Sequence, residues 1–205
     1  MSLASRPAFF LPALIAAILA AVLAWSIFVG EPAPDVQWRI PEFDLTSQTG
    51  GAFGSDDLDG RVWIANFFFT SCTTVCPPLM RTMNDIAGRL EDEGLGELRL
   101  VSFTVDPRFD TPERLADYGE RMGLDTERWA FLTEEPGIMR ALLEQGFYVP
   151  MGERRNMPGG GFEIAHSGHL LLVDRELGVR GIYGSDREGV EELLEDARRV
   201  RSARS

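Results

Sequence analysis

The 205-residue sequence predicts an α/β fold preceded by an N-terminal transmembrane helix. Segments typical of buried strands alternate with segments of helical periodicity, and the chain is long enough for one globular domain. The uncharged stretch 8–30 predicts the membrane helix. We therefore divide the chain into a membrane anchor at 1–30, a proline-containing linker at 31–36 and a folded domain at 37–205.

The uncharged stretch is long enough to cross a bilayer, for which about 20 apolar residues suffice. A cleaved signal peptide is the alternative, but its apolar region is usually about 7–15 residues long and is followed by an A-x-A-like site, which this stretch lacks. Arg6 precedes the stretch, and Glu31 and Asp35 follow it, so the positive-inside rule keeps the N-terminus cytoplasmic. We expect a single-pass protein of the cytoplasmic (inner) membrane with its domain on the extracytoplasmic, periplasmic side.

Composition excludes several classes of function. Asp and Glu number 32 against 20 Lys and Arg, and the resulting net charge of -12 disfavours binding to nucleic acid. The chain contains no lysine, which excludes Schiff-base chemistry and a Walker-type phosphate loop. Only two cysteines and two histidines are available for thiol or soft-metal chemistry.

The order of the elements predicts a largely parallel sheet with an antiparallel edge. Strands are expected at 61–69, 98–105, 169–174 and 179–183, the last two joined by a turn at 176–178. Helices are expected after Pro77-Pro78, from the D-T-P-E segment at 110–113 to Gly123, between Thr133 and Gly146, and around 190–197.

Both cysteines follow the first strand, in F-F-F-T-S-C-T-T-V-C-P-P at 67–78. Catalytic groups in α/β sheets collect beyond the carboxyl ends of strands. Pro77 and Pro78 fit a first helical turn, so Cys76 lies near unpaired N–H groups that favour a thiolate. A structural disulfide is the alternative, but so small a loop would stabilise the fold little. We interpret Cys72 and Cys76 as a functional pair, able to pair with each other or to share a metal ion.

A metal site that uses both cysteines would need a third donor, and a histidine is the most suitable candidate. His169 fits the first position of a strand and is interpreted as structural, whereas His166 lies in the polar loop before it. Two thiolates and one imidazole suit Cu(I), and can also take Cu(II) or zinc. Met151 and Met157 are interpreted as loop or packing residues.

The chain resembles the Sco/SenC family of membrane-anchored, thioredoxin-fold copper proteins that assist assembly of cytochrome c oxidase. Three blocks carry the resemblance: the strand and C-x-x-x-C-P at 66–77, V-S-F-T-V-D-P-R-F-D-T-P-E at 101–113, and His-Ser at 166–167 before the strand that ends at Asp174. The resemblance implies a thioredoxin-like fold, copper ligands at Cys72, Cys76 and His166, and a reversible Cys72–Cys76 disulfide.

The resemblance also implies the partners. The family delivers copper to the binuclear copper centre of oxidase subunit II, or keeps the cysteines of that subunit reduced; a copper donor protein and a thiol reductant would act upstream. The chain departs from the family at Ala165, where an acidic residue usually precedes the ligand histidine. Asp106 matches the family's other acidic residue near the site.

These observations favour a metallochaperone over an enzyme, with a metal-free thiol-disulfide reductase as the main alternative. Thioredoxin-like oxidoreductases usually separate their cysteines by two residues and carry a proline just before the facing strand; here the separation is three, and no proline follows Pro158. A peroxidase is disfavoured because Phe69 stands where peroxiredoxins place a threonine. Copper or redox sensing through the two cysteines is a third alternative.

Overall fold

A computed structural model describes residues 14–19, 31–74, 76–126, 128–152, 154–156, 162–164 and 168–203. The chain divides into two compact units, Met1–Pro32 and Ala33–Ser205. In the first unit, residues 14–19 are helical. Within the described ranges, no helix has the length and apolar character needed to cross a membrane.

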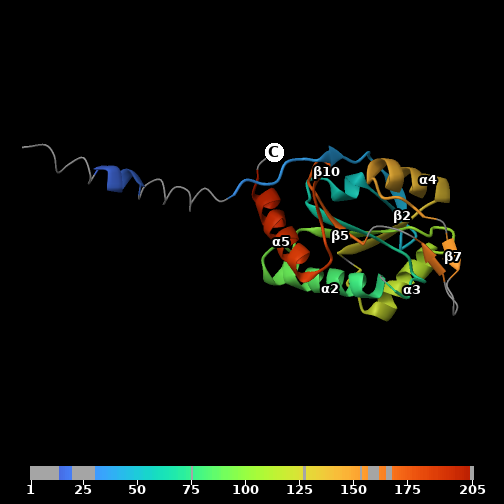
Figure 1. Ribbon diagram of the computed structural model, residues 1–205. Helices are drawn as coiled ribbons and strands as arrows, with labels where there is room; N and C mark the ends of the chain where they lie inside the picture. The colour runs from blue at the N-terminus through green and yellow to red at the C-terminus, as the bar shows by residue number, and fades with distance from the viewer. Residues whose placement is uncertain are drawn as a thin grey trace, which may run out of the picture. The chain divides into compact units, whose positions relative to one another are not determined.

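An eight-stranded sheet forms the centre of the second unit (Figure 1). Its strands are β1 (Trp38–Arg39), β2 (Asp44–Ser47), β3 (Ala52–Gly54), β4 (Trp63–Phe68), β5 (Arg99–Thr104), β6 (Trp129–Thr133), β9 (Leu170–Val173) and β10 (Gly178–Tyr183). They lie in the order β1-β10-β9-β4-β5-β6-β2-β3, and a separate two-stranded sheet pairs β7 (Arg154–Asn156) with β8 (Phe162–Ile164). The strand–helix alternation predicted from the sequence is therefore confirmed.

The expectation of a largely parallel sheet is wrong. Only β4, β5 and β6 run parallel to one another. On one side of these strands, the hairpin of β9 and β10 places β9 antiparallel to β4. On the other side, the hairpin of β2 and β3 places β2 antiparallel to β6. The sheet is mixed because short hairpins, which need no crossover helix, extend it in both directions.

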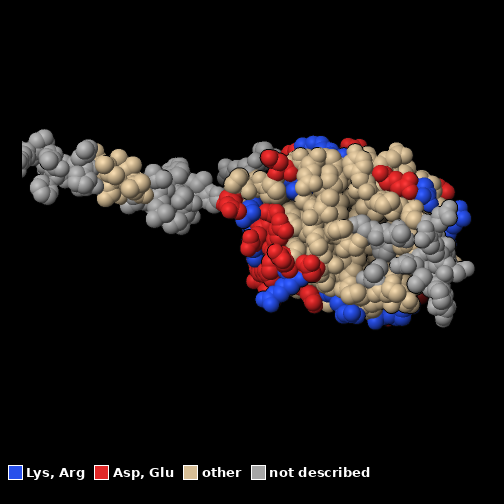
Figure 2. Space-filling view, viewed as in Figure 1, with Lys and Arg blue, Asp and Glu red and all other residues tan. Residues whose placement is uncertain are grey.

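Helices cover both faces of the sheet. They are the 3₁₀-helix η1 (Ser55–Leu58), α2 (Cys76–Asp92), α3 (Pro112–Met122), α4 (Pro136–Ala141), the π-helix η2 (Leu142–Gly146) and α5 (Arg187–Ser202). In Figure 1, α2, α3 and α5 lie on the side of the sheet opposite α4. Acidic side chains gather over α5 (Figure 2), where the side chains of Glu191 and Glu195 are at least half exposed.

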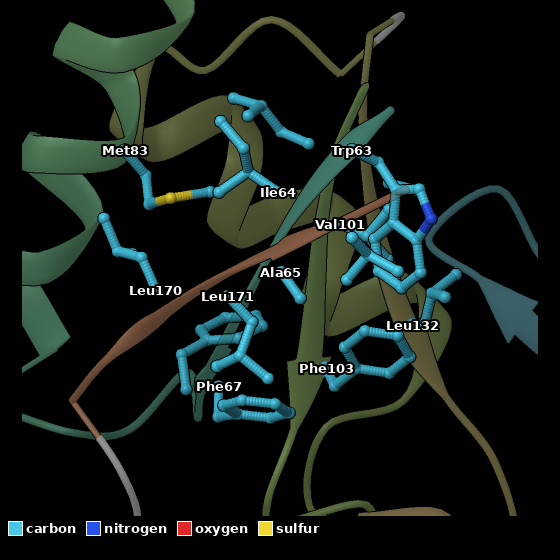
Figure 3. Packing of buried hydrophobic residues seen from close by; sticks show 14 of the residues in the cluster. Trp63, Ile64, Ala65, Phe67, Met83, Val101, Phe103, Leu132, Leu170 and Leu171 are labelled. Carbon is cyan, nitrogen blue, oxygen red and sulfur yellow. The ribbon is translucent and has the colours of Figure 1, made fainter. Parts of the chain in front are cut away.

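β4 is buried on both faces along its whole length. Ile64 points towards Met83 of α2, while Trp63 and Phe103 lie on the other face of the sheet (Figure 3). Further along, the ring of Phe67 packs 5.4 Å from that of Phe147. Apolar packing on both sides therefore fixes the direction in which the chain leaves β4.

A buried hydrogen-bond network crosses the three parallel strands. Ser102 donates to Oδ1 of Asn66 at 2.5 Å and accepts from the indole N–H of Trp129 at 2.7 Å. The amide of Asn66 also lies 3.5 Å from the sulfur of Met80 in α2. Because Asn66 and Ser102 are fully buried, neither has water as an alternative partner.

Replacing Ser102 by Ala is expected to lower the free energy of unfolding by about 1–3 kcal/mol, since both Asn66 and Trp129 would lose a buried partner. Urea denaturation measures this loss. Ser202, exposed at the end of α5, provides the matched control, and Ser202→Ala should change stability by less than about 0.5 kcal/mol. Equal effects of the two substitutions would contradict the role of the network.

Candidate functional site

The two cysteines lie in the turn that joins β4 to α2. The backbone N–H of Cys72 donates to the carbonyl of Phe69 at 3.2 Å, which closes the turn after β4. Cys76 is the first residue of α2, and its backbone N–H donates to Sγ of Cys72 at 3.3 Å. The sequence prediction that Cys76 stands at a helix N-terminus is confirmed. The Thr74 hydroxyl lies 3.8 Å from the same sulfur.

The two thiols differ in acidity. A hydrogen bond with the side chain of Cys76 is the main cause that lowers the pKa of Cys72, to about 5; burial opposes it, and the N–H groups of Cys76 and Thr74 add to it. The same side-chain hydrogen bond, together with burial, raises the pKa of Cys76 above its ordinary value. The pair therefore holds one thiolate, on Cys72, and one thiol, on Cys76, at neutral pH.

The two sulfurs also differ in access. Cys72 is 8% exposed, whereas Cys76 is fully buried. Neither forms a disulfide in this structure. Cys72, whose thiol is the more acidic, is therefore also the less buried of the two residues.

A buried carboxylate ties the cysteine turn to the neighbouring strand. Asp110 accepts hydrogen bonds from the backbone N–H of Thr70 at 3.0 Å, from the Thr70 hydroxyl at 2.5 Å and from the Thr104 hydroxyl at 2.5 Å. The predicted helix start at 110–113 is confirmed, but Thr111 caps it, and the side chain of Asp110 turns inward. The sequence alone did not indicate a role for Asp110, because in D-T-P-E either Asp110 or Thr111 could be the helix cap.

A hollow of about 790 Å³ opens where β5 and β6 end. Asp106 and Phe109 border it on the β5 side, Arg140 on the β6 side, and Met151 and Ile164 complete its lining. Asp106, predicted to lie near the site, is almost completely buried there. Met151 is also buried, in agreement with its interpretation as a packing residue.

The structure describes one of the two histidines. His169 is exposed and lies one residue before β9, so it is not the first residue of the strand as expected; ladder pairing begins at Leu170 with Tyr183. Ala165, His166 and Met157 lie outside the described residues. β8 ends at Ile164 on the rim of the hollow, two positions before His166 in the sequence.

Among the described residues, Cys72 and Cys76 have no third His, Cys, Asp or Glu side chain placed with them to hold a metal ion. No group of three or more His, Cys, Asp or Glu side chains in the described part of the chain is placed to hold a metal ion. A three-ligand site at Cys72 and Cys76 thus requires a donor from elsewhere, and sulfur donors favour a soft ion. Without a metal, the same pair has the thiolate and the neighbouring thiol that disulfide exchange needs.

Comparisons with known proteins agree with this architecture. The SCO1/SenC family model matches residues 33–202. The SCO1 protein homolog of Bacillus subtilis (strain 168) is 30% identical over 156 residues, which cover 76% of this chain and 77% of that protein. The structure also resembles that of BsSco, described as a member of the Sco family of cytochrome c oxidase assembly proteins with a disulfide switch. The TM-score is 0.72 at 25% identity, with 85% of this chain and all of the other covered.

A second solved structure extends the likeness at the level of the fold. Bradyrhizobium japonicum ScoI with copper bound has a TM-score of 0.67 at 22% identity, with 80% of this chain and 99% of that chain covered. The thioredoxin-like Sco fold expected from the sequence is confirmed. With a family match that spans most of its length, the chain belongs to the SCO1/SenC family.

Proposed function

We propose that the chain is a membrane-anchored copper chaperone that assists assembly of the binuclear copper centre of cytochrome c oxidase. Copper is the cargo, and Cys72, Cys76 and His166 are its ligands. The observation that carries the proposal is the pair of sulfurs at the end of β4, one of them stabilised as a thiolate. A copper chaperone needs such a site, because thiolates hold Cu(I) while remaining open to exchange.

Relatives support both the copper binding and the role in oxidase assembly that we propose. BsSco is described as belonging to a family of cytochrome c oxidase assembly proteins, and the Bradyrhizobium japonicum protein of the same fold is known with copper bound. Sulfur and imidazole ligands suit Cu(I) and also accept Cu(II). The proposed receiver is oxidase subunit II; a copper donor protein and a thiol reductant would prepare the chain for each cycle.

Copper transfer would proceed by stepwise ligand exchange. Cys72 is the accessible ligand, so an incoming thiolate of subunit II replaces it first. Cys76, fully buried at the start of α2, holds the ion until a second incoming ligand arrives. Oxidation to the Cys72–Cys76 disulfide removes both thiolates, so copper loading requires the reduced pair.

The proposed location is the cytoplasmic membrane, with residues 1–30 as a single-pass anchor and the domain at 37–205 on the periplasmic side. A tether raises the effective concentration of the domain near a membrane-embedded partner. The acidic face over α5 (Figure 2) would repel the phosphates of nucleic acid, which agrees with a protein partner.

A metal-free thiol-disulfide reductase is the second candidate, and the asymmetry of the two thiols favours it. The Cys72 thiolate would attack a disulfide of the partner and release one partner thiolate. Cys76 would then lose its proton, which passes to the released partner thiolate or to solvent, and attack the mixed disulfide, releasing the second partner thiolate and leaving the Cys72–Cys76 disulfide. Two electrons pass from the chain to the partner, and an external thiol reductant restores the pair.

A Cu(I) titration of the reduced full-length chain, under anaerobic competition with a Cu(I) chelator, tests the chaperone proposal. We expect one equivalent per chain, lost in Cys72→Ser and in Cys76→Ser. His166→Ala should weaken binding by about tenfold or more, as expected when a metal site loses the orientation or the donor that an imidazole provides.

His169→Ala is the matched control for the His166 variant and should leave Cu(I) binding unchanged, because His169 is exposed beside β9. If His169→Ala were the damaging change, the ligand assignment would be wrong. No binding above the chelator, together with ready exchange of the Cys72–Cys76 disulfide, would instead establish the reductase.

The acidity of Cys72 predicts the pH dependence of its alkylation in the reduced, metal-free chain. With a pKa of about 5, Cys72 remains a thiolate from pH 8 to pH 6, so its rate of reaction with iodoacetamide stays nearly constant there and falls as the pH drops through 5. Cys76→Ala removes the main stabilising hydrogen bond, so the pKa of Cys72 rises towards its ordinary value and the rate already falls between pH 8 and pH 6. Mass spectrometry of the labelled chain measures both rates. Identical pH profiles for the two proteins would contradict the assigned cause.

A further inference from the structure

Tyr148 has a backbone conformation that its side chain disfavours. Its φ is 55°, in the left-handed region, which glycine adopts freely but which is costly for a residue with a bulky side chain. Among the described residues, Leu177 is the only other non-glycine residue with a positive φ. The Tyr148 side chain is 66% exposed, so burial of its ring does not hold the backbone in this state. Such a conformation persists where neighbouring contacts enforce it.

Trp38, from a distant part of the sequence, contacts this strained turn. Its ring lies edge-on to that of Tyr148, with 5.5 Å between the ring centroids. Its indole N–H donates to the carbonyl of Gly146, the last residue of η2, at 2.9 Å. Trp38 is itself held in the sheet, where it pairs with Val179 of β10. Because an edge-to-face aromatic contact is worth about as much as a left-handed residue costs, it offsets the strain at Tyr148.

The residues on both sides of the turn are fixed. Gly146 lies against Pro41, so closely that a Cβ at position 146 would stand 2.8 Å from Cδ of that proline. On the other side, the N–H of Val149 donates to the carbonyl of Leu143 at 2.8 Å, and the Val149 side chain is buried. The left-handed turn at Tyr148 therefore sets the direction in which the chain continues.

That direction leads to the hollow at the ends of β5 and β6. Met151 lines the hollow, and its carbonyl accepts a hydrogen bond from the guanidinium of Arg140 at 3.2 Å. The chain then forms β7, in which Arg154 pairs with Ile164 of β8. Ile164 also lines the hollow, and it stands two positions before His166 in the sequence. One paired hairpin therefore joins the turn at Tyr148 to the segment that precedes the proposed copper ligand.

We propose that Trp38 and Tyr148 are positioning residues for copper binding: together they hold the left-handed turn that directs the chain into the β7–β8 hairpin. If the turn relaxes, the hairpin adopts more arrangements and a smaller fraction of chains is competent to bind. The apparent affinity then falls by that fraction. This inference rests on the proposed function, because His166 follows the hairpin. The turn itself is held by contacts within the metal-free chain.

Two substitutions of Tyr148 separate the ring contact from the backbone conformation. Tyr148→Ala removes the ring that contacts Trp38 but keeps a Cβ, which disfavours a φ of 55°. Tyr148→Gly removes the ring and the Cβ together, so the left-handed turn no longer needs support. If the side chain itself mattered, glycine would be at least as harmful as alanine. The proposal predicts the reverse order, and both variants should fold because the side chain is exposed.

Trp38→Phe tests the other side of the contact. It keeps an aromatic ring but removes the N–H that the Gly146 carbonyl accepts. Combining it with Tyr148→Gly should restore the behaviour of the wild-type chain, because a glycine turn does not depend on Trp38. Ile182→Ala is the matched control: it also removes a large, half-exposed side chain, but from β10 and without a positive φ.

Two measurements on the reduced full-length chain test the proposal: hydrogen exchange without metal, and anaerobic Cu(I) competition. For Tyr148→Ala and Trp38→Phe we expect amide exchange at 149–156 to be about threefold to tenfold faster, the range expected for loss of an aromatic contact. The Cu(I) affinity should fall by a similar factor. Tyr148→Gly, Ile182→Ala and the double variant should match the wild type in both measurements.

The proposal is overturned if Tyr148→Ala has the wild-type value in either measurement, if alanine and glycine at position 148 have equal effects, or if Tyr148→Gly fails to rescue Trp38→Phe. Its failure is distinct from that of the proposed function. A wild-type chain that binds Cu(I), with an affinity that Tyr148→Ala leaves unchanged, keeps the proposed function and loses only this proposal. A wild-type chain that binds no Cu(I) overturns both.

Discussion

Burial of β4 on both faces is the constraint on which the rest of the domain depends. A strand enclosed by α2 on one side and by aromatic rings on the other cannot shift its register without moving apolar side chains out of the core. Its end therefore lies at a fixed point, and the turn that begins at Thr70 starts from there. The position of Cys72 at the open end of the sheet follows from this packing.

The asymmetry of the two thiols connects the alternative functions. Cys76 donates its backbone N–H to the sulfur of Cys72, and the side chains of the two cysteines are hydrogen-bonded. The Cys72 thiol is therefore the more acidic and the less buried of the two, while Cys76 stays protonated and fully buried. A metal carrier uses this arrangement to hold an ion by one secure and one exchangeable ligand. A reductase uses it as a nucleophile with a resolving thiol.

Local patterns in the sequence predicted the helices and strands around the site. The order of the strands in the sheet could not be predicted in the same way, because it depends on pairing between distant segments. The apolar run at 61–69, the two prolines after Cys76 and the D-T-P-E segment predicted β4, α2 and α3, because each signal lies within a few residues. The insertion of β9 beside β4, the pairing of β1 with β10 and the pairing of β2 with β6 depend on contacts between distant segments. Asp110 was missed because its place before Thr111-Pro112 also fits a helix cap, and its actual partner Thr70 is 40 positions away.

The sequence separations within the site also set an order of events as the chain folds. Cys72 and Cys76 are four positions apart, so their sulfurs can meet in an unfolded chain after closure of a very short loop. The contact between Thr70 and Asp110 spans 40 positions and must wait until β4 and β5 pair. An emerging chain in an oxidising compartment can thus acquire its disulfide before it has a core. In the folded domain Cys76 is fully buried and Cys72 is 8% exposed, so the agent that reopens the bond approaches it from the side of Cys72.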